Sequence, residues 1–297
     1  MSSLPNPKIF CFGLGFTSLS LCDRLRQSGW EIAGTVRSEQ KANLLEKAGI
    51  QAFVFDGIEE NPDVTKALHD SNYIVNSVPV PVPDSFDPIF NIYGSVIEAC
   101  QNMRWFGYLS TTVVYGNHNG GWVNEETPCE PSGKRGLNRL AAERAWSGLS
   151  IPVHIFRLAG IYGPGRNALE TIKAGKAKRI DKQGQVFSRI HVQDIATALK
   201  ASMEKPKGKI GEPAIYNLCD DEPCEPRAVI EYGCQLLGVD PPPLVPYEEA
   251  NLSPMGRTFY EDNKRVSNQK IKDELDVTLD YPNYRLALDE LAKDLSR

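Results

Sequence analysis

The stretch KIFCFGLGFTS, residues 8–18, joins a short apolar strand pattern to a glycine-rich turn, and a helical pattern begins directly after it. This is the G-x-G-x-x-G spacing of a dinucleotide-binding turn, with Ser18 in the last place. Gly13 would permit the tight turn, Gly15 would let the backbone approach a pyrophosphate, and Ser18 would keep helix and strand close. The pattern predicts a cofactor site with contacts from Gly13, Gly15, Phe16, Thr17 and Ser18. A tight turn without a ligand is the alternative.

Short apolar runs alternate with amphipathic segments along the first half of the chain, for example EIAGTV (31–36), KANLLEKAG (41–49) and QAFVFD (51–56). Such alternation is typical of βαβ units in a parallel sheet that is covered by helices on both faces. The sequence therefore predicts an α/β protein, a Rossmann-type doubly wound parallel sheet with a smaller C-terminal substrate lobe. We expect the sheet domain at residues 1–160, with strands returning near 187–220, and the lobe at 161–186 and 221–297.

The composition is that of an ordinary soluble globular protein, with 41% apolar residues, 24% charged residues and a formal net charge of −5. The apolar runs are far shorter than the ~20 residues that cross a bilayer, and the start of the chain lacks a secretory signal pattern. Dispersed basic residues argue against nucleic acid as a partner. Seven cysteines without paired zinc spacing indicate buried free thiols in a reducing compartment. We expect a cytoplasmic monomer or homodimer with no metal and no membrane partner.

The end of the second strand pattern bears on the choice of cofactor. An NAD-preferring protein would carry an acidic residue there for the ribose 2′-hydroxyl, whereas this sequence has Arg37 and Ser38. A guanidinium and a hydroxyl suit a 2′-phosphate, so the sequence predicts NADP(H). The alternative is that Arg37 is solvated, Ser38 caps the next helix, and Glu39 leaves NAD as the cofactor. Ser77 follows the fourth strand pattern, where parallel strands form a ligand crevice, and is a further candidate contact.

Several more segments agree, in order, with those of the extended and atypical short-chain dehydrogenases/reductases. The chain resembles this group of nucleoside-diphosphate-sugar epimerases and dehydratases over nearly its whole length. The matching segments are GLGFTS (13–18), NIYGSVIEA (91–99), LSTTVVYG (109–116), RLAGIYGPG (157–165), RIHVQDIA (189–196) and YNL with the following DDE (216–222). The resemblance implies a Rossmann fold, a nicotinamide cofactor and a small sugar-type substrate, and it adds Tyr162 of the YGPG loop to the expected cofactor contacts.

The family works through a Ser or Thr, a Tyr and a Lys, often with an Asn. The resemblance puts Thr111 at the first position and Asn91 at the last, but Arg135 stands at the tyrosine position and Arg139 at the lysine position. Arginine stays protonated and has no lone pair, so Arg135 cannot serve as the base that the tyrosine provides. Arg139 would still hydrogen-bond the nicotinamide ribose, as the lysine does. Tyr115 is the substitute base that we consider, with packing or contact with the substrate as its alternative role.

Two further groups of residues have both a functional and a structural interpretation. His191 has the chemistry of a base, although its segment in the family is structural. Basic side chains would suit a cofactor phosphate or an anionic substrate, and a solvated charged face is the alternative. They are Lys134, Arg144, Lys173, Lys176, Lys178, Arg179, Lys182, Arg257, Lys264 and Arg265.

Three hypotheses about function follow. The first is an atypical NADP-dependent oxidoreductase or epimerase-like enzyme that acts on a small, anionic, sugar-type substrate. In it Thr111 orients the reacting oxygen, and a residue outside the usual motif, or a bound water, carries the proton. The second is a regulatory or scaffold protein that kept the cofactor site and lost turnover. The third is a dehydratase or isomerase without net redox change.

Overall fold

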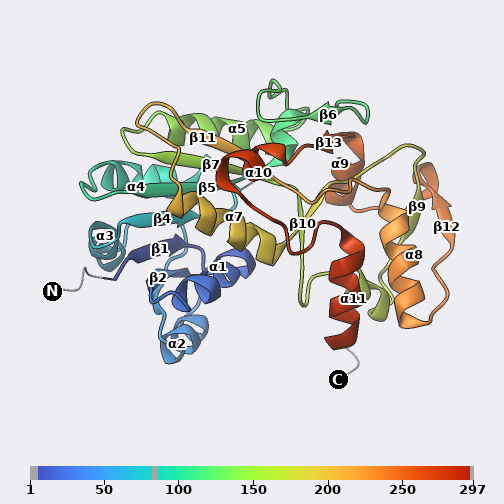
Figure 1. Cartoon of the computed structure of the whole chain (residues 1–297), viewed down its shortest axis with the longest axis horizontal. Coiled ribbons are helices and arrows are strands. Elements are labelled where there is room, and N and C mark those ends of the chain that lie inside the picture. The colour runs from blue at the N-terminus through green and yellow to red at the C-terminus, as the bar shows by residue number, and fades with distance from the viewer. Residues whose placement is uncertain (1–5, 82–85, 295–297) are drawn as a thin grey trace.

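The centre of the molecule is a seven-stranded parallel sheet (Figure 1), in a computed structural model that describes residues 6–81 and 86–294. The strand order is β11-β7-β5-β4-β1-β2-β3, and every neighbouring pair is parallel. The predicted Rossmann-type doubly wound sheet is thereby confirmed. The strands are β1 (Lys8–Phe12), β2 (Glu31–Val36), β3 (Gln51–Val54), β4 (Tyr73–Asn76), β5 (Trp105–Thr111), β7 (Val153–Leu158) and β11 (Ala214–Leu218).

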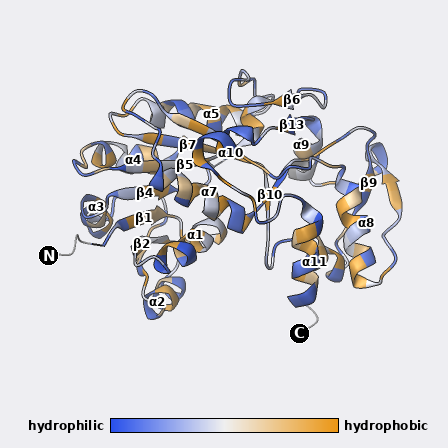
Figure 2. Ribbon diagram, in the orientation of Figure 1, coloured by the Kyte–Doolittle hydropathy of each residue, from blue (hydrophilic) through white to orange (hydrophobic). Residues whose placement is uncertain are grey.

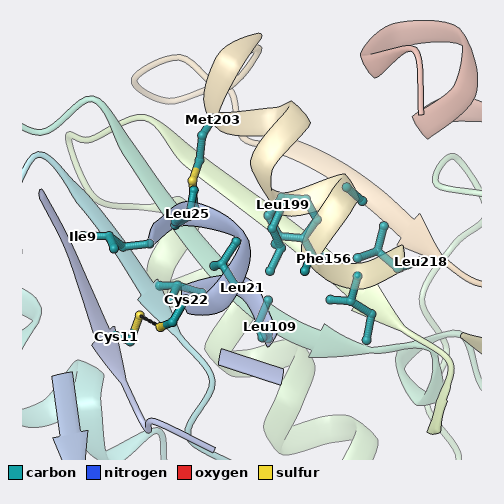
Figure 3. Close-up of a cluster of buried hydrophobic side chains, with 14 of the residues drawn as sticks. Ile9, Cys11, Leu21, Cys22, Leu25, Leu109, Phe156, Leu199, Met203 and Leu218 are labelled. Atoms are coloured by element: carbon teal, nitrogen blue, oxygen red, sulfur yellow. Dashed lines mark hydrogen bonds between the residues drawn. The ribbon is translucent and has the colours of Figure 1, made fainter. Parts of the chain in front are cut away.

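Helices cover both faces of this sheet, which explains why the sequence of β1 is apolar throughout. Successive side chains of a strand point to opposite faces, so Ile9 and Cys11 of β1 pack in one core and Phe10 and Phe12 in the other. Figure 3 shows Ile9 and Cys11 near Leu21 on the first face. That face carries α1 (Phe16–Arg26), α2 (Glu39–Lys47) and α7 (Val192–Glu204); the other carries α3 (Pro62–His69), α4 (Pro88–Glu98) and α5 (Lys134–Ser147).

Smaller elements form a second cluster, and Figure 1 shows α8, β9, β12 and α11 gathered at one end of the molecule. Their core includes Leu169, Val229 and Leu288, and Figure 2 shows that α8 and α11 carry both hydrophobic and hydrophilic residues. The elements are α6 (Ala168–Lys173), β9 (Arg179–Asp181), α8 (Pro226–Leu237), β12 (Leu244–Pro246), η2 (Tyr247–Glu249), α9 (Pro254–Glu261) and α11 (Tyr284–Asp294).

Short pieces of structure connect the two clusters. Two parallel pairs do so, β8 (Gly160–Tyr162) with β10 (Arg189–His191), and β6 (Trp122–Val123) with β13 (Arg265–Val266). The 3-10 helix η1 (Thr112–Tyr115) follows β5 directly. Helix α10 (Gln269–Leu275) lies in the range expected for the lobe, yet its Ile271 and Leu275 belong to the apolar core of the sheet domain.

No helix in the described parts of the chain is long and apolar enough to cross a membrane. Within the same residues, no group of His, Cys, Asp and Glu side chains could hold a metal ion. All seven cysteines are free thiols, five of them buried and two half-buried.

Candidate functional site

The glycine-rich turn between β1 and α1 presents backbone donors to solvent. Gly13 has a φ of 83°, a left-handed conformation that favours glycine. Gly15 is the N-cap of α1, and no side chain caps this helix, so the N–H groups of its first turn have neither an intrahelical nor a side-chain acceptor. A Cβ on Gly15 would meet nothing closer than the Gly13 carbonyl at 4.0 Å. The turn therefore leaves room for an anion at the helix start.

Three hydroxyl groups brace this turn. The Ser18 hydroxyl donates to the Ser77 hydroxyl at 2.9 Å, and Ser77 Oγ lies 2.8 Å from the Gly13 carbonyl and 2.9 Å from that of Phe12, to one of which it donates. On the other side, the Gly13 N–H donates to Thr35 Oγ1 at 2.9 Å. Ser18 and Ser77 were predicted from the sequence as cofactor contacts, and the structure gives both a bracing position. The sequence reasoning missed Thr35, which lies on β2.

Arg37 and Ser38 lie where β2 leads into α2, and both side chains are exposed. The Ser38 hydroxyl accepts from the Lys41 N–H at 3.4 Å and so caps α2, which is the alternative role considered for it. Arg37 forms no ion pair with another residue in the described ranges. The Arg37 guanidinium is therefore exposed and has no counter-ion among the described residues.

A cleft of about 1000 Å³ lies between the first turn of α1, the end of β5 and the smaller cluster of elements. Six residues predicted as cofactor contacts do not line it: Gly13, Gly15, Phe16, Ser18, Arg37 and Ser38. Of the residues predicted for the site, it is lined by Thr17, Ser77, Thr111, Arg139 and Tyr162. Its cationic lining residues outnumber the two carboxylates, Glu261 and Asp262, and so favour an anionic ligand. The cations are Lys134, Arg135, Arg139, Arg166, Lys176, Lys178, Arg189 and Lys264.

Thr111 ends β5 and is half-buried in the cleft wall. Its hydroxyl accepts from the Val113 N–H at 3.4 Å and caps η1. A hydroxyl that accepts one such bond still has a proton to donate. Thr111 can therefore hydrogen-bond an oxygen atom of a ligand in the cleft.

The other two predicted catalytic residues do not line the cleft. Asn91 is exposed on α4. Tyr115 is fully buried; its hydroxyl donates to Asn217 Oδ1 at 2.7 Å and accepts from Arg157 at 3.0 Å. Burial raises the pKa of Tyr115 to about 12, although the neighbouring Arg157 opposes the shift. Since η1 turns this ring into the protein, Tyr115 is placed for packing, not for proton exchange with a ligand.

Arg157 links Tyr115 to α5 through a buried ion pair. Its guanidinium donates to Glu143 at 2.8 and 3.3 Å, and both side chains are at most 5% exposed. Ser110 donates to the same carboxylate. This network holds η1, α5 and β7 together beneath the floor of the cleft.

The two arginines that the resemblance places at the Tyr and Lys positions both contact aromatic side chains. Arg139 donates to the Tyr108 hydroxyl at 2.9 Å and to the Leu109 carbonyl at 3.2 Å. The guanidinium of Arg135 lies 5.5 Å from the centre of the Phe259 ring of α9. Burial, and then the charge of Arg139, lower the pKa of Arg135, but a guanidinium remains protonated at accessible pH.

A lysine and a carboxylate from the last third of the chain also reach the cleft. Lys264 Nζ donates to the Gly116 carbonyl at 2.8 Å and lies 3.4 Å from Asp262 Oδ2, while Ser132 donates to Asp262 Oδ1 at 2.8 Å. The lysine side chain is 9% exposed, and burial lowers its pKa despite the opposing effect of Asp262. Lys264 was among the basic candidates, whereas nothing in the sequence pattern indicated Asp262.

Beside the cleft lie buried polar groups without partners among the described residues, namely Tyr162 Oη, His191 Nε2 and both carboxyl oxygens of Asp220. Burial raises the pKa of Asp220 to about 8 and lowers that of His191 to about 4. His191 Nδ1 accepts from the Gln193 N–H at 3.4 Å and caps α7, which agrees with a structural role. Tyr162 lines the cleft itself, and burial raises its pKa.

Comparison with known proteins identifies the family to which this chain belongs. Residues 13–219 match the model of a family described as NAD dependent epimerase/dehydratase. The chain is 26% identical to Protein YeeZ of Escherichia coli K12 over 271 residues, which cover 88% of this chain and 93% of that protein. It is 43% identical to a functionally unknown conserved protein from Silicibacter pomeroyi, with a TM-score of 0.88 over 98% of this chain and 100% of that one.

Enzymes of known activity share the fold at lower identity. A UDP-glucuronic acid 4-epimerase from Bacillus cereus, solved in complex with NAD, is 18% identical with a TM-score of 0.75; the match covers 98% of this chain and 100% of the epimerase. At this level of identity the likeness concerns the fold alone.

Proposed function

Because this chain belongs to the NAD dependent epimerase/dehydratase family, we propose that it binds NADP(H) and acts as an atypical oxidoreductase or epimerase-like enzyme. Its substrate in this proposal is a small, anionic, sugar-type molecule. One observation carries the proposal: the cleft is lined by Thr17, in the first turn of the uncapped helix α1, and by a wall of cationic side chains around Thr111. A bound nicotinamide would supply the hydride acceptor or donor, and the residues of the chain would bind, orient and protonate.

The glycine turn fits the diphosphate of a dinucleotide. Its first-turn N–H groups have no side-chain acceptor, and the space at Gly15 is open. At the adenine end, Arg37 has a guanidinium without an ion-pair partner in the described ranges, which supports NADP(H) over NAD because a 2′-phosphate gives it a charge-assisted contact. Ser38 already caps α2, so in this proposal Arg37 makes the greater contribution.

The reacting end of the cleft lies near Thr111 and the start of α5. The proposal gives Thr111 the role of donating a hydrogen bond to the reacting oxygen. Arg135 has no lone pair with which to accept a proton, and the proton therefore needs another carrier. We favour Lys264, whose amine lines the cleft, is anchored by the Gly116 carbonyl, and has a pKa that burial lowers.

The charge of the cleft supports an anionic substrate. Arg135, Arg189 and Lys176 are among its cationic lining residues, while Glu261 and Asp262 are its only lining carboxylates within the described ranges. Asp262 is already engaged by Ser132 and Lys264. A carboxylate or phosphate on the substrate would therefore meet an excess of positive charge.

A panel experiment tests this function. The purified protein is incubated with NADP⁺ or NADPH and a range of nucleotide-activated and acidic sugars; absorbance at about 340 nm follows net hydride transfer, and NMR of the products follows conversions without net redox change. We expect turnover with at least one anionic sugar and its loss in Thr111→Val. Thr197→Val, which removes a hydroxyl on α7 outside the cleft, is the matched control.

One observation favours a second function, in which the protein binds NADP(H) and regulates or scaffolds without turnover. Arg139, which the resemblance places at the lysine position, uses Nη1 to donate to Tyr108 and to the Leu109 carbonyl, as a structural residue would. This function predicts tight nucleotide binding with no conversion anywhere in the panel. Turnover that Thr111→Val abolishes would eliminate it.

A further inference from the structure

The loop between β8 and α6 forms a tight turn that is held at both ends. Gly163 and Arg166 exchange two backbone hydrogen bonds, each 3.0 Å long. Asn167 caps α6 by accepting from the Glu170 N–H at 3.1 Å, and its Nδ2 donates to the Gly163 carbonyl at 2.9 Å. Because its backbone is fixed in this way, the turn projects the Arg166 side chain from a defined position.

This turn packs directly on the start of α1. A Cβ added to Gly163 would lie 3.2 Å from Cζ of Phe16 and 2.8 Å from Cγ1 of Val192, so a side chain at residue 163 would push the turn away from Phe16. The guanidinium of Arg166 lies over the Phe16 ring, with its Cζ 5.8 Å from the ring centre. Phe16 is the first residue of α1. The turn thus carries a cation to the helix start whose N–H groups are uncapped.

The Arg166 guanidinium is free to bind a ligand. Its side chain is exposed, lines the cleft, and makes no ion pair or hydrogen bond with any residue in the described ranges. Tyr162, the residue directly before this turn, also lines the cleft; it is 8% exposed and its hydroxyl has no partner among the described residues. The Tyr162 hydroxyl itself is buried, so Arg166 is the group that this loop directs to the cleft.

We propose that Arg166 binds the diphosphate of the dinucleotide, on the side opposite the N–H groups of α1. This inference rests on the proposed function and deepens it. A diphosphate carries two negative charges, and a guanidinium makes short charge-assisted hydrogen bonds to phosphate oxygens. The Phe16 ring beneath Arg166 keeps the planar group close to the helix start. Cofactor binding would then depend on the loop that leads into the smaller cluster as well as on the sheet domain.

Nucleotide titrations of Arg166→Gln test the inference, with Arg26→Gln as the control. Arg26 is exposed at the opposite end of α1 and lies outside the cleft. The probes are NADPH, ADP-ribose, which has the diphosphate without nicotinamide, adenosine 2′-monophosphate, which has no diphosphate, and UDP-glucose, which carries a diphosphate on a sugar. For Arg166→Gln we expect the Kd values of NADPH and ADP-ribose to rise about tenfold or more. The Kd of adenosine 2′-monophosphate should stay within about twofold, and the salt dependence of NADPH binding should weaken.

A second variant tests whether the Phe16 ring positions the Arg166 guanidinium for cofactor binding. Phe16→Leu retains an apolar side chain but removes the face on which the guanidinium lies, and should raise the NADPH Kd about threefold, in keeping with a loss of ~0.5–1 kcal/mol. Thermal unfolding of each variant verifies that it folds.

Three results would overturn the inference. Equal NADPH affinity in Arg166→Gln and Arg26→Gln would show that Arg166 makes no contact with the cofactor. Weakened binding of UDP-glucose with unchanged binding of NADPH would assign Arg166 to a substrate diphosphate. If the wild-type protein binds no dinucleotide at all, the proposed function fails and takes this inference with it, an outcome distinct from the other two.

Discussion

Arg139 donates to the hydroxyl of Tyr108 at 2.9 Å, and its guanidinium also lies over the ring of that tyrosine, 5.5 Å from the ring centre. Arg139, which the resemblance places at the lysine position, thus ties α5 to β5. Tyr108 is fully buried, so this contact satisfies a hydroxyl that has no access to water.

Replacing Arg139 by Met should therefore destabilise the fold. The Tyr108 hydroxyl would lose its partner, and leaving such a group buried and unsatisfied costs about 1–3 kcal/mol. Urea denaturation gives the change in the free energy of unfolding. Arg144→Met on the exposed side of α5 is the control and should stay within about 0.5 kcal/mol of wild type. Equal losses in the two variants would contradict a bracing role for Arg139.

Breaking the buried ion pair between Glu143 and Arg157 should destabilise the fold more than Arg139→Met does. Glu143→Gln preserves the shape of the side chain but leaves the guanidinium of Arg157 buried without its counter-charge, which costs about 3–5 kcal/mol. Chemical denaturation measures the loss, and Glu204→Gln, which breaks an exposed pair with Lys200, should cost under ~0.5 kcal/mol. A small loss in Glu143→Gln would mean that the pair is hydrated and that Tyr115 is less firmly held than the structure shows.

Asp220 should impose a pH dependence on stability. Burial raises its folded pKa to about 8, whereas the unfolded value is about 3.9. Between these two pH values the unfolded chain is ionised and the folded chain holds the proton, so stability falls as pH rises, by up to about 1.4 kcal/mol per pH unit. The stability of Asp220→Asn relative to wild type should therefore increase as pH rises through this range, which thermal unfolding measures. Asp23→Asn, at an exposed site, should show no such pH-dependent change. A pH-independent difference between Asp220→Asn and wild type would show that the Asp220 carboxyl is ionised in the folded protein.

Cofactor preference should depend on Arg37. In Arg37→Asp the carboxylate repels a 2′-phosphate and accepts a hydrogen bond from a 2′-hydroxyl. We expect the Kd of NADPH to rise about tenfold or more and that of NADH to fall. Fluorescence titrations with both nucleotides measure the change. Unaltered preference would mean that Arg37 is only a solvated side chain.

The fold and the glycine turn could be predicted from the sequence because both depend on patterns of neighbouring residues. A turn with left-handed φ at Gly13 and an open approach at Gly15 requires particular residues at adjacent positions, so it leaves a signature in the sequence. The alternation of strand and helix patterns specifies the parallel sheet in the same way.

Contacts between distant segments could not be predicted in this way. Tyr115 has the chemistry of a base, but η1 turns its ring inward to Asn217, 102 residues further along the chain. Asp262 and Lys264 reach the cleft only because their segment packs against Gly116 and Ser132. Such placements depend on tertiary packing, and no local spacing in the sequence encodes them.

The most direct test of the account is a fluorescence titration of the wild-type protein and of Gly15→Val with NADPH. A side chain at residue 15 would point into open space, so the variant should fold, while its methyl groups would occupy the place of the diphosphate. We predict saturable binding of NADPH to the wild type and a Kd at least about tenfold higher in Gly15→Val. If NADPH and NADH both fail to bind the wild-type protein, or if Gly15→Val binds NADPH equally well, the glycine turn is not a cofactor site and the central claim is wrong.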